Sequence, residues 1–217
     1  MINYKNFRIS KLNTDEYKHL KYLLFWPIFG LMFLFVERFY GVGSYYVMHH
    51  PIDDLIPFCE WFIFPYFFWF IYLVGMHLYT LLYDTEAFTK MMRYIIFTYS
   101  IAIIIYLIFP TCQNLRPVAF ERDNLLTRFL TGFYQFDTNT NVCPSIHVMG
   151  SLAVMEAALY TKSIKSKWCK GAFVVIAVLI CLSTMFLKQH SVLDVLSALP
   201  FCIIAHVLFF RKGDARK

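Results

Sequence analysis

The sequence predicts an all-α, polytopic membrane protein with six transmembrane helices in one bundle. The 217 residues are 59% hydrophobic and only 16% charged, which is too apolar for the surface of a soluble domain of this size. Six stretches also approach the length that crosses about 30 Å of hydrocarbon, although Pro, Gly or polar residues interrupt several of them. We therefore expect one membrane-embedded helical domain over residues 1–217.

The predicted spans follow one another without an internal repeat or a linker that would divide the chain. The segment before the first span is hydrophilic and contains no short apolar core followed by small residues, so we expect no removable signal peptide. The six spans are Leu20–Val36, Phe62–Leu82, Met92–Phe109, Ile146–Thr161, Gly171–Leu187 and Leu193–Phe210.

Basic residues predict the orientation of these spans. Because cytoplasmic segments are enriched in Lys and Arg, we expect both termini in the cytoplasm and segments 37–61, 110–145 and 188–192 on the external side. The net charge of +6 lies at span ends, which indicates topology and attraction to anionic lipid rather than nucleic-acid binding. The basic residues that set the orientation are Lys5, Arg8, Lys11, Lys18, Lys21, Lys162, Lys165, Lys167, Lys170, Arg211, Lys212, Arg216 and Lys217.

A histidine and a carboxylate are spaced for contact at the start of the sixth span. In KQHSVLD, His190 and Asp194 are four residues apart, which places them on one helical face. The carboxylate would hold the proton of one ring nitrogen and leave the other as a nucleophile or base. An acid inside an apolar helix is unfavourable and is by default a functional residue. The alternative is an interfacial histidine beside a buried acid that has another partner.

Two other external segments carry groups suited to an anion. In NVCPSIHVMG, Pro144 starts a helix whose free N–H groups and dipole favour phosphate, and Ser145 adds a hydroxyl before His147. On its own this pattern also describes ordinary helix capping. Arg116, in QNLRP, has a charged guanidinium whose geometry fits phosphate oxygens. The alternative is an arginine whose side chain extends to the membrane edge.

Together these residues resemble the motifs of the type 2 phosphatidic-acid phosphatase superfamily, which are K-x6-R-P, P-S-G-H and S-R-x5-H-x3-D. The order and spacing agree from residue 109 to residue 194, which is more specific than any single motif. The segments that carry the site are about 110–147 and 183–194. The matching residues are Arg116-Pro117, Pro144-Ser145-Ile146-His147, and Ser183-Thr184 followed by His190 and Asp194.

Three positions depart from these motifs. Phe109 replaces the lysine, Ile146 replaces the glycine and Thr184 replaces the arginine. The loss of two cations matters because a transferred phosphoryl group spreads negative charge over its oxygens. Lys188 lies four residues after Thr184, on the same face if that helix continues, so we expect it to supply the missing charge.

The resemblance implies a metal-independent lipid phosphate phosphatase of the cell membrane, with no cofactor and its active site on the extracytoplasmic side. His190 would attack phosphorus to form a phosphohistidine, Asp194 would orient the imidazole, and His147 would protonate the leaving oxygen. The partners would be a lipid phosphate and the membrane, with no nucleic acid, and the sequence does not fix an oligomeric state. The phosphoryl oxygens would be bound by Arg116, Ser145 and Lys188.

Three other functions remain open. A lipid phosphotransferase, similar to sphingomyelin or inositol phosphorylceramide synthases, would pass the group to a lipid alcohol instead of water. A metal site would add His49 and His50 to the motif histidines, although Arg116 would repel a cation. A non-catalytic lipid-binding or transport protein would use the same polar groups to line a pathway.

Two pairs in the external segments also have open roles. Asp53 and Asp54 would bind a headgroup, orient Arg116 or simply face solvent. Cys112 and Cys143 bracket one external segment, so a disulfide between them is one alternative to two small packing residues.

Overall fold

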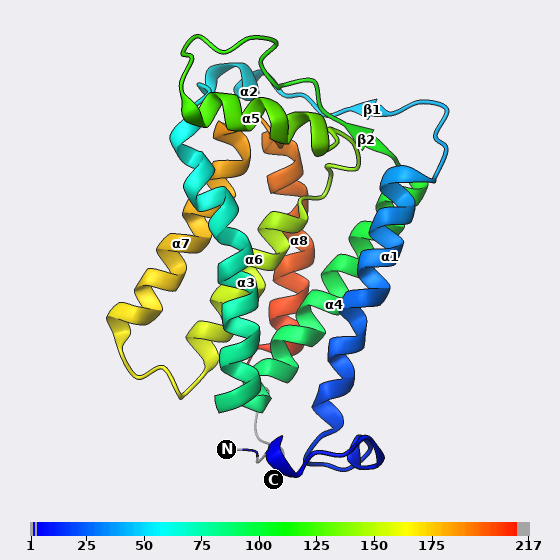
Figure 1. Cartoon of the computed structure of the whole chain (residues 1–217), viewed down its shortest axis with the longest axis vertical. Coiled ribbons are helices and arrows are strands. Elements are labelled where there is room, and N and C mark those ends of the chain that lie inside the picture. The colour runs from blue at the N-terminus through cyan, green and yellow to red at the C-terminus, as the bar shows by residue number, and fades with distance from the viewer. Residues whose placement is uncertain (1, 3, 212–217) are drawn as a thin grey trace.

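The computed structural model describes residues 2 and 4–211, and the described chain is mostly helical (Figure 1). Two short helices, α2 (Pro51–Leu55) and α5 (Leu125–Phe136), lie across one end of the long helices. The strands β1 (Tyr46–Val47) and β2 (Thr111–Cys112) form a parallel pair near that end. The long helices are α1 (Phe25–Arg38), α3 (Ile63–Tyr83), α4 (Thr85–Ile108), α6 (Ile146–Tyr160), α7 (Lys167–Phe186) and α8 (Val192–Phe209).

Short 3-10 helices extend two of the long helices at their N-terminal ends. η3 (Lys18–Leu24) leads into α1, and η4 (Glu60–Phe62) leads into α3. Two further turns, η1 (Tyr4–Asn6) and η2 (Ile9–Lys11), precede them at the end of the bundle where α4 begins (Figure 1). The all-α class predicted from the sequence is therefore confirmed.

Among the described residues, five helical stretches are long and apolar enough to cross a membrane: Lys18–Arg38, Glu60–Tyr83, α4, α7 and α8. By their length and composition, these stretches indicate a multi-pass membrane protein. The orientation of the spans stays a prediction, and Lys212, Arg216 and Lys217, which contributed to it, lie outside the described residues.

The predicted span Ile146–Thr161 corresponds to α6, which has only 15 residues. At 1.5 Å per residue α6 is about 22 Å long, shorter than a hydrocarbon core of about 30 Å. The non-helical segment 141–145 before it is buried. Irregular backbone is tolerated at membrane depth when protein surrounds it. A sixth full-length helical span therefore stays a prediction.

α6 occupies the centre of the helix packing. It contacts α3, α4, α7 and α8, whereas α1 packs chiefly on α4 at the edge. Small side chains let helix backbones approach closely in a membrane, where lipid tails give little hydrophobic drive to helix association. The small buried residues of α6 are Gly150, Ser151, Ala153, Ala157 and Ala158.

The external segment 110–145 is folded onto the bundle rather than extended. Asn124 caps α5 through the N–H groups of its first turn, and its Nδ2 donates to the buried Glu60 carboxylate at 3.1 Å. The Tyr134 hydroxyl donates to the Leu187 carbonyl at 2.5 Å. α5 is thereby fixed over the end of the bundle where α3, α6 and α8 begin (Figure 1).

The tight packing around Gly150 of α6 predicts a stability difference between two glycines. A Cβ at Gly150 would collide with the Tyr99 hydroxyl and lie 3.2 Å from Trp69 Nε1, so we expect Gly150→Ala to lower the free energy of unfolding by roughly 1–3 kcal/mol. Gly171 of α7 has no atom within 4 Å of the added Cβ, so Gly171→Ala should be neutral or stabilising by up to about 1 kcal/mol. Thermal unfolding in detergent compares them, and equal midpoints would contradict this packing.

Candidate active site

The residues of the predicted motifs meet at the end of the bundle where α3, α6 and α8 begin. His147 lies in the first turn of α6, and His190 lies in the turn between α7 and α8. Both line a cavity of about 50 Å³ together with Glu37 of α1, Tyr66 of α3 and Tyr106 of α4. Four helices, the turn before α8 and the segment 137–142 therefore contribute side chains to the same space.

Asp194 fixes the orientation of His190. Asp194 Oδ2 lies 3.1 Å from His190 Nδ1 and accepts a hydrogen bond of 3.0 Å from the Ser191 N–H group. Asp194 is fully buried, and His190 is nearly so. A neutral His190 that donates through Nδ1 keeps a lone pair on Nε2. The contact predicted from the four-residue spacing is therefore present in the structure.

His147 is held among aromatic rings. Its ring centroid lies 4.8 Å from that of Tyr66, 4.6 Å from that of Trp69 and 5.6 Å from that of His190. Its Nδ1 is buried and has no hydrogen-bond partner among the described residues. The two histidines are thus close enough to act on one bound group.

The N-terminal end of α6 is prepared for a polar ligand. No side chain caps its first N–H groups, and the Ser145 hydroxyl is buried without a partner in the described part of the chain. The Ser145 backbone N–H donates to the Asp194 carbonyl at 3.1 Å, which joins the second motif to the third. Unpaired donors at the positive end of a helix dipole suit an anion.

Asp53 positions the turn that carries His190. Its Oδ2 accepts from the Ser191 hydroxyl at 2.6 Å and from the His50 N–H group at 2.8 Å, and its Oδ1 accepts from the Val192 N–H group at 2.8 Å. The buried Asp53 carboxylate therefore holds the first residues of α8, a role that the sequence analysis did not consider. Asp54 differs, because it is exposed and pairs with His49 at 3.0 Å.

The Arg116 guanidinium lies beside the cavity and is bound by protein oxygens. Nη1 donates to the Asp137 carbonyl at 2.7 Å, and Nη2 donates to Gln189 Oε1 at 2.5 Å and to the Asp137 carboxylate at 3.1 Å. Two further backbone carbonyls also accept from it. Arg116 does not line the cavity itself. It would have to exchange some of these oxygens to bind phosphate.

Lys188 extends away from the cavity. It has a φ of 53° directly after α7, and its Nζ donates to the carbonyls of Asp53, at 2.6 Å, and of Ile56. Burial lowers the pKa of the Lys188 ammonium, and the nearby Asp53 and Asp54 oppose this shift. Lys188 thus fastens α2 to the turn before α8. Its contact with a phosphate stays a prediction.

Two carboxylates that the sequence analysis did not include line the cavity. Glu37 accepts hydrogen bonds from Asn141 Nδ2, at 2.9 Å, and from the Thr138 hydroxyl. Asp137 pairs with Arg116, and burial raises the pKa of Asp137 although Arg116 opposes the shift. An acid near the end of an apolar span is the signal that would have identified Glu37.

Buried polar atoms without a partner are concentrated around this cavity. Buried polar groups in folded proteins are nearly always paired, so such a cluster needs an explanation, and a polar ligand or water would provide it. Among the described residues, the unpaired atoms around the cavity include both hydrogen-bond donors and acceptors. The atoms are Arg116 Nε, Asn141 Oδ1, Ser145 Oγ, His147 Nδ1, Gln189 Nε2 and Asp194 Oδ1.

Other residues singled out in the sequence lie away from the cavity. His50 accepts a hydrogen bond of 3.2 Å from the Ile52 N–H group, so it caps α2, while His49 pairs with Asp54. Cys112 and Cys143 are free thiols. The disulfide considered from the sequence is therefore absent from the structure.

The comparison with known families covers most of the site. The family model of the PAP2 superfamily matches residues 90–217. The chain belongs to this superfamily. No curated protein and no solved structure matches the chain. The PAP2 assignment confirms the resemblance found in the sequence, while Glu37, Asp53 and Tyr66 lie outside the matched residues.

The PAP2 superfamily includes phosphatases and phosphotransferases and is generally phosphoesterase-like. Two motif positions that hold a lysine and an arginine in the superfamily are occupied here by Phe109 and Thr184, and neither side chain places a positive charge at the site. Phe109 is exposed at the end of α4, and the Thr184 hydroxyl donates to the Cys181 carbonyl at 2.8 Å.

The role of Asp53 predicts a difference between neighbouring acids. Asp53→Ala would leave the Ser191 hydroxyl and the Val192 N–H group without their acceptor, so we expect the free energy of unfolding to fall by roughly 2–3 kcal/mol. Asp54→Ala removes an exposed pair and should change it by about 0.5 kcal/mol or less. Thermal unfolding in detergent measures both, and equal losses would show that Asp53 is not a structural anchor.

Proposed function

We propose that the chain is an integral membrane lipid phosphate phosphatase that acts through a phosphohistidine at the extracytoplasmic face. The observation that carries the proposal is the position of His190, with Nδ1 on Asp194 and its ring 5.6 Å from that of His147. Membership of the PAP2 superfamily supports this chemistry. A headgroup-level site would let the lipid chains stay in the bilayer during the reaction.

In the first step, His190 Nε2 would attack phosphorus and the bond to the lipid oxygen would break. His147 would donate a proton to that oxygen as it leaves. In the second step, His147 would take a proton from water, whose oxygen would displace His190 and release inorganic phosphate. Asp194 would stabilise the charged imidazole in both steps, because its carboxylate already accepts from Nδ1.

Charge on the phosphoryl oxygens would be met by protein donors. The unpaired Ser145 hydroxyl and the free N–H groups of α6 lie next to His147. Arg116 would contribute by exchanging its bond with Gln189, which is adjacent to His190. Lys188 would join them only after leaving the carbonyls of α2, so we place it last among the proposed phosphate ligands.

The positions of basic residues support the proposed membrane face. The cavity lies at one end of the bundle, whereas η3 and the α6–α7 connection lie at the other (Figure 1). Lys18, Lys21, Lys162 and Lys165 are on these two segments. Positively charged segments favour the cytoplasm, so the site would face the opposite side.

Substitution of the two histidines tests the reaction. With a panel of lipid phosphates, His190→Ala should lower phosphate release on the order of 10⁴-fold or more, and His147→Ala by roughly 10²–10⁴-fold. His206→Ala is the matched control, because His206 is on α8 but pairs with Glu156. Activity should persist in chelator. Equal release by the wild type and His190→Ala would exclude His190 as the nucleophile.

A second candidate function, lipid phosphotransfer, is favoured by the carboxylates in the cavity. Glu37 and Asp137 would repel a bare phosphate dianion but would accept hydrogen bonds from the hydroxyl groups of a headgroup or a lipid alcohol. From a phosphodiester, attack of His190 would release one alcohol and leave a phosphohistidine that still carries the other ester group, which a lipid alcohol would then take from His190 instead of water. A phosphodiester substrate carries less negative charge and would fit such a site better than a monoester.

Glu37→Gln distinguishes the two candidate functions. In a transferase, the loss of an acceptor should lower transfer to a lipid alcohol roughly 10–100-fold, since a lost hydrogen bond in a buried site costs about 1–3 kcal/mol. In a phosphatase, hydrolysis of a monoester should not fall, because a negative charge near the substrate is removed. Glu156→Gln, at the other end of α6, is the control and should change neither reaction.

A further inference from the structure

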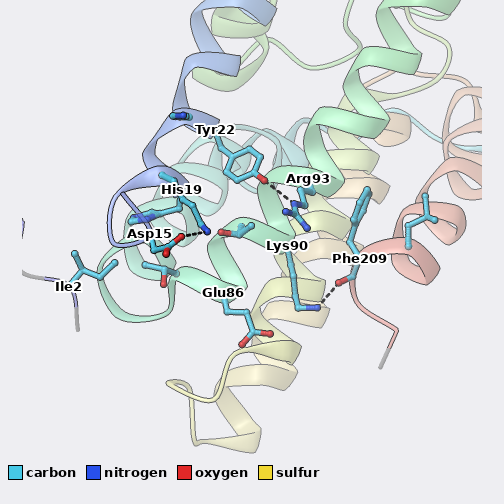
Figure 2. Close-up of a pocket in the computed structure, with 13 residues that line it drawn as sticks. Ile2, Asp15, His19, Tyr22, Glu86, Lys90, Arg93 and Phe209 are labelled. Carbon is cyan, nitrogen blue, oxygen red and sulfur yellow. Dashed lines mark hydrogen bonds and ion pairs between the residues drawn. The ribbon is translucent and has the colours of Figure 1, made fainter. Parts of the chain in front are cut away.

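A second cavity lies at the opposite end of the bundle from His190. It measures about 780 Å³ and is bounded by η3, the first turns of α4 and the last residues of α8 (Figure 2). Residues such as Tyr22, Lys90 and Phe209 come together there from three parts of the chain. Nothing in the proposed reaction uses this cavity, so its side chains need a separate account.

The cavity has an excess of positive charge. Four cationic side chains line it, Lys18, Lys21, Lys90 and Arg93, against the two carboxylates of Asp15 and Glu86. Both carboxylates are already occupied. Asp15 pairs with Lys18 at 2.5 Å, and Glu86 accepts from the Tyr160 hydroxyl. The charge of the remaining cations is therefore unbalanced within the cavity.

Arg93 is held in place while part of its fork stays available. Its Nε donates to the Tyr22 hydroxyl at 2.9 Å (Figure 2), and its terminal nitrogens have no hydrogen bond among the described residues. Lys21 is exposed and likewise has no hydrogen-bond partner in the described part of the chain. A pre-oriented guanidinium with its two terminal nitrogens free matches the oxygens of a phosphate.

One face of α4 adds further donors. Thr85, Thr89 and Arg93 are four residues apart in turn, so they share a face of the helix. Lys90 lies beside them and donates to the Phe209 carbonyl at 2.8 Å, which links α4 to the end of α8 (Figure 2). The face thus offers hydroxyl donors next to the guanidinium.

In a membrane crossed by the long helices, lipid headgroups would lie at the level of this cavity. It lies where membrane-length helices end, and apolar side chains of Tyr22, Leu208 and Phe209 form part of its wall. Leu208 in this wall is exposed, and so is Leu24, the last residue of η3. A ligand with a phosphate head and acyl chains would therefore meet cations and apolar surface together.

We propose that this cavity binds the phosphate headgroup of an anionic membrane lipid from the leaflet opposite the catalytic site. The lipid would bridge Lys21 and Arg93 and so tie η3 to α4. Basic pockets between helices at the cytoplasmic surface are suited to such headgroups. A lipid is favoured over free phosphate because free phosphate would leave the apolar wall uncovered.

Thermal unfolding of the full-length protein in detergent tests the proposal. Phosphatidylglycerol should raise the unfolding midpoint by several degrees, because a ligand bound only to the folded state stabilises it. Phosphatidylcholine and inorganic phosphate, each added alone, should give little or no shift. An equal shift with inorganic phosphate would overturn the lipid assignment.

Two double variants, each lacking two positive charges, distinguish a specific lipid site from general electrostatic attraction of the protein to anionic lipid. Lys21→Gln/Arg93→Gln should lose most of the phosphatidylglycerol shift. Lys162→Gln/Lys167→Gln removes the same charge from exposed positions outside this cavity and should keep it. Arg116→Gln should keep it too, since it alters only the catalytic end. Equal shifts in the two double variants would show that no specific site exists.

If the Lys21→Gln/Arg93→Gln variant does not fold, Tyr22→Phe provides a second test of the proposal. It removes the 2.9 Å bond to Arg93 but leaves every cation in the cavity. We expect a lower midpoint without lipid and retention of most of the phosphatidylglycerol shift. Native mass spectrometry should then count a retained anionic lipid on the wild type and on Tyr22→Phe, and its absence from both would overturn the proposal.

Discussion

The candidate site depends on one buried carboxylate, that of Asp194. Its Oδ2 accepts from His190 Nδ1 and from the Ser191 N–H group, while its backbone carbonyl accepts from the Ser145 N–H group. A buried acid is strongly unfavourable unless it is hydrogen-bonded, and Asp194 makes its side-chain hydrogen bonds through Oδ2. Asp194 therefore sets the start of α8, the orientation of His190 and the position of the second motif relative to the third.

Contacts with residues far along the chain also hold the segment around Asp194 in place. Asp53 binds the first residues of α8, and Lys188 binds the carbonyl of Asp53, so α2 and the turn before α8 support each other. Arg116 connects segment 137–138 to Gln189 in the same way. The segments around α2 and at 110–145 are thus part of the site, and the contacts of Arg116 help to hold segment 110–145 against the bundle.

The sequence predicted the features that depend on local spacing and composition. Hydropathy located the long helices, and the four-residue spacing predicted the contact between His190 and Asp194. It did not predict the side-chain direction of Lys188, because the helix that would have kept Lys188 in phase with Thr184 ends at Phe186 and Lys188 takes a positive φ. The partnership of Asp53 with Ser191 joins residues 138 positions apart and has no local pattern. Glu37 could have been recognised by the argument that singled out Asp194, since both are acids in apolar helices.

The claim that His190 carries the phosphoryl group is tested most directly by trapping that intermediate. Purified protein is mixed briefly with a lipid phosphate labelled at phosphorus, denatured in base, digested and examined by mass spectrometry. The account predicts a base-stable, acid-labile phosphoryl group on the peptide that contains His190. In Asp194→Asn, this phosphoryl group should be absent or markedly reduced. Turnover with the label on another residue, or with no covalent label at any time during the reaction, would contradict it.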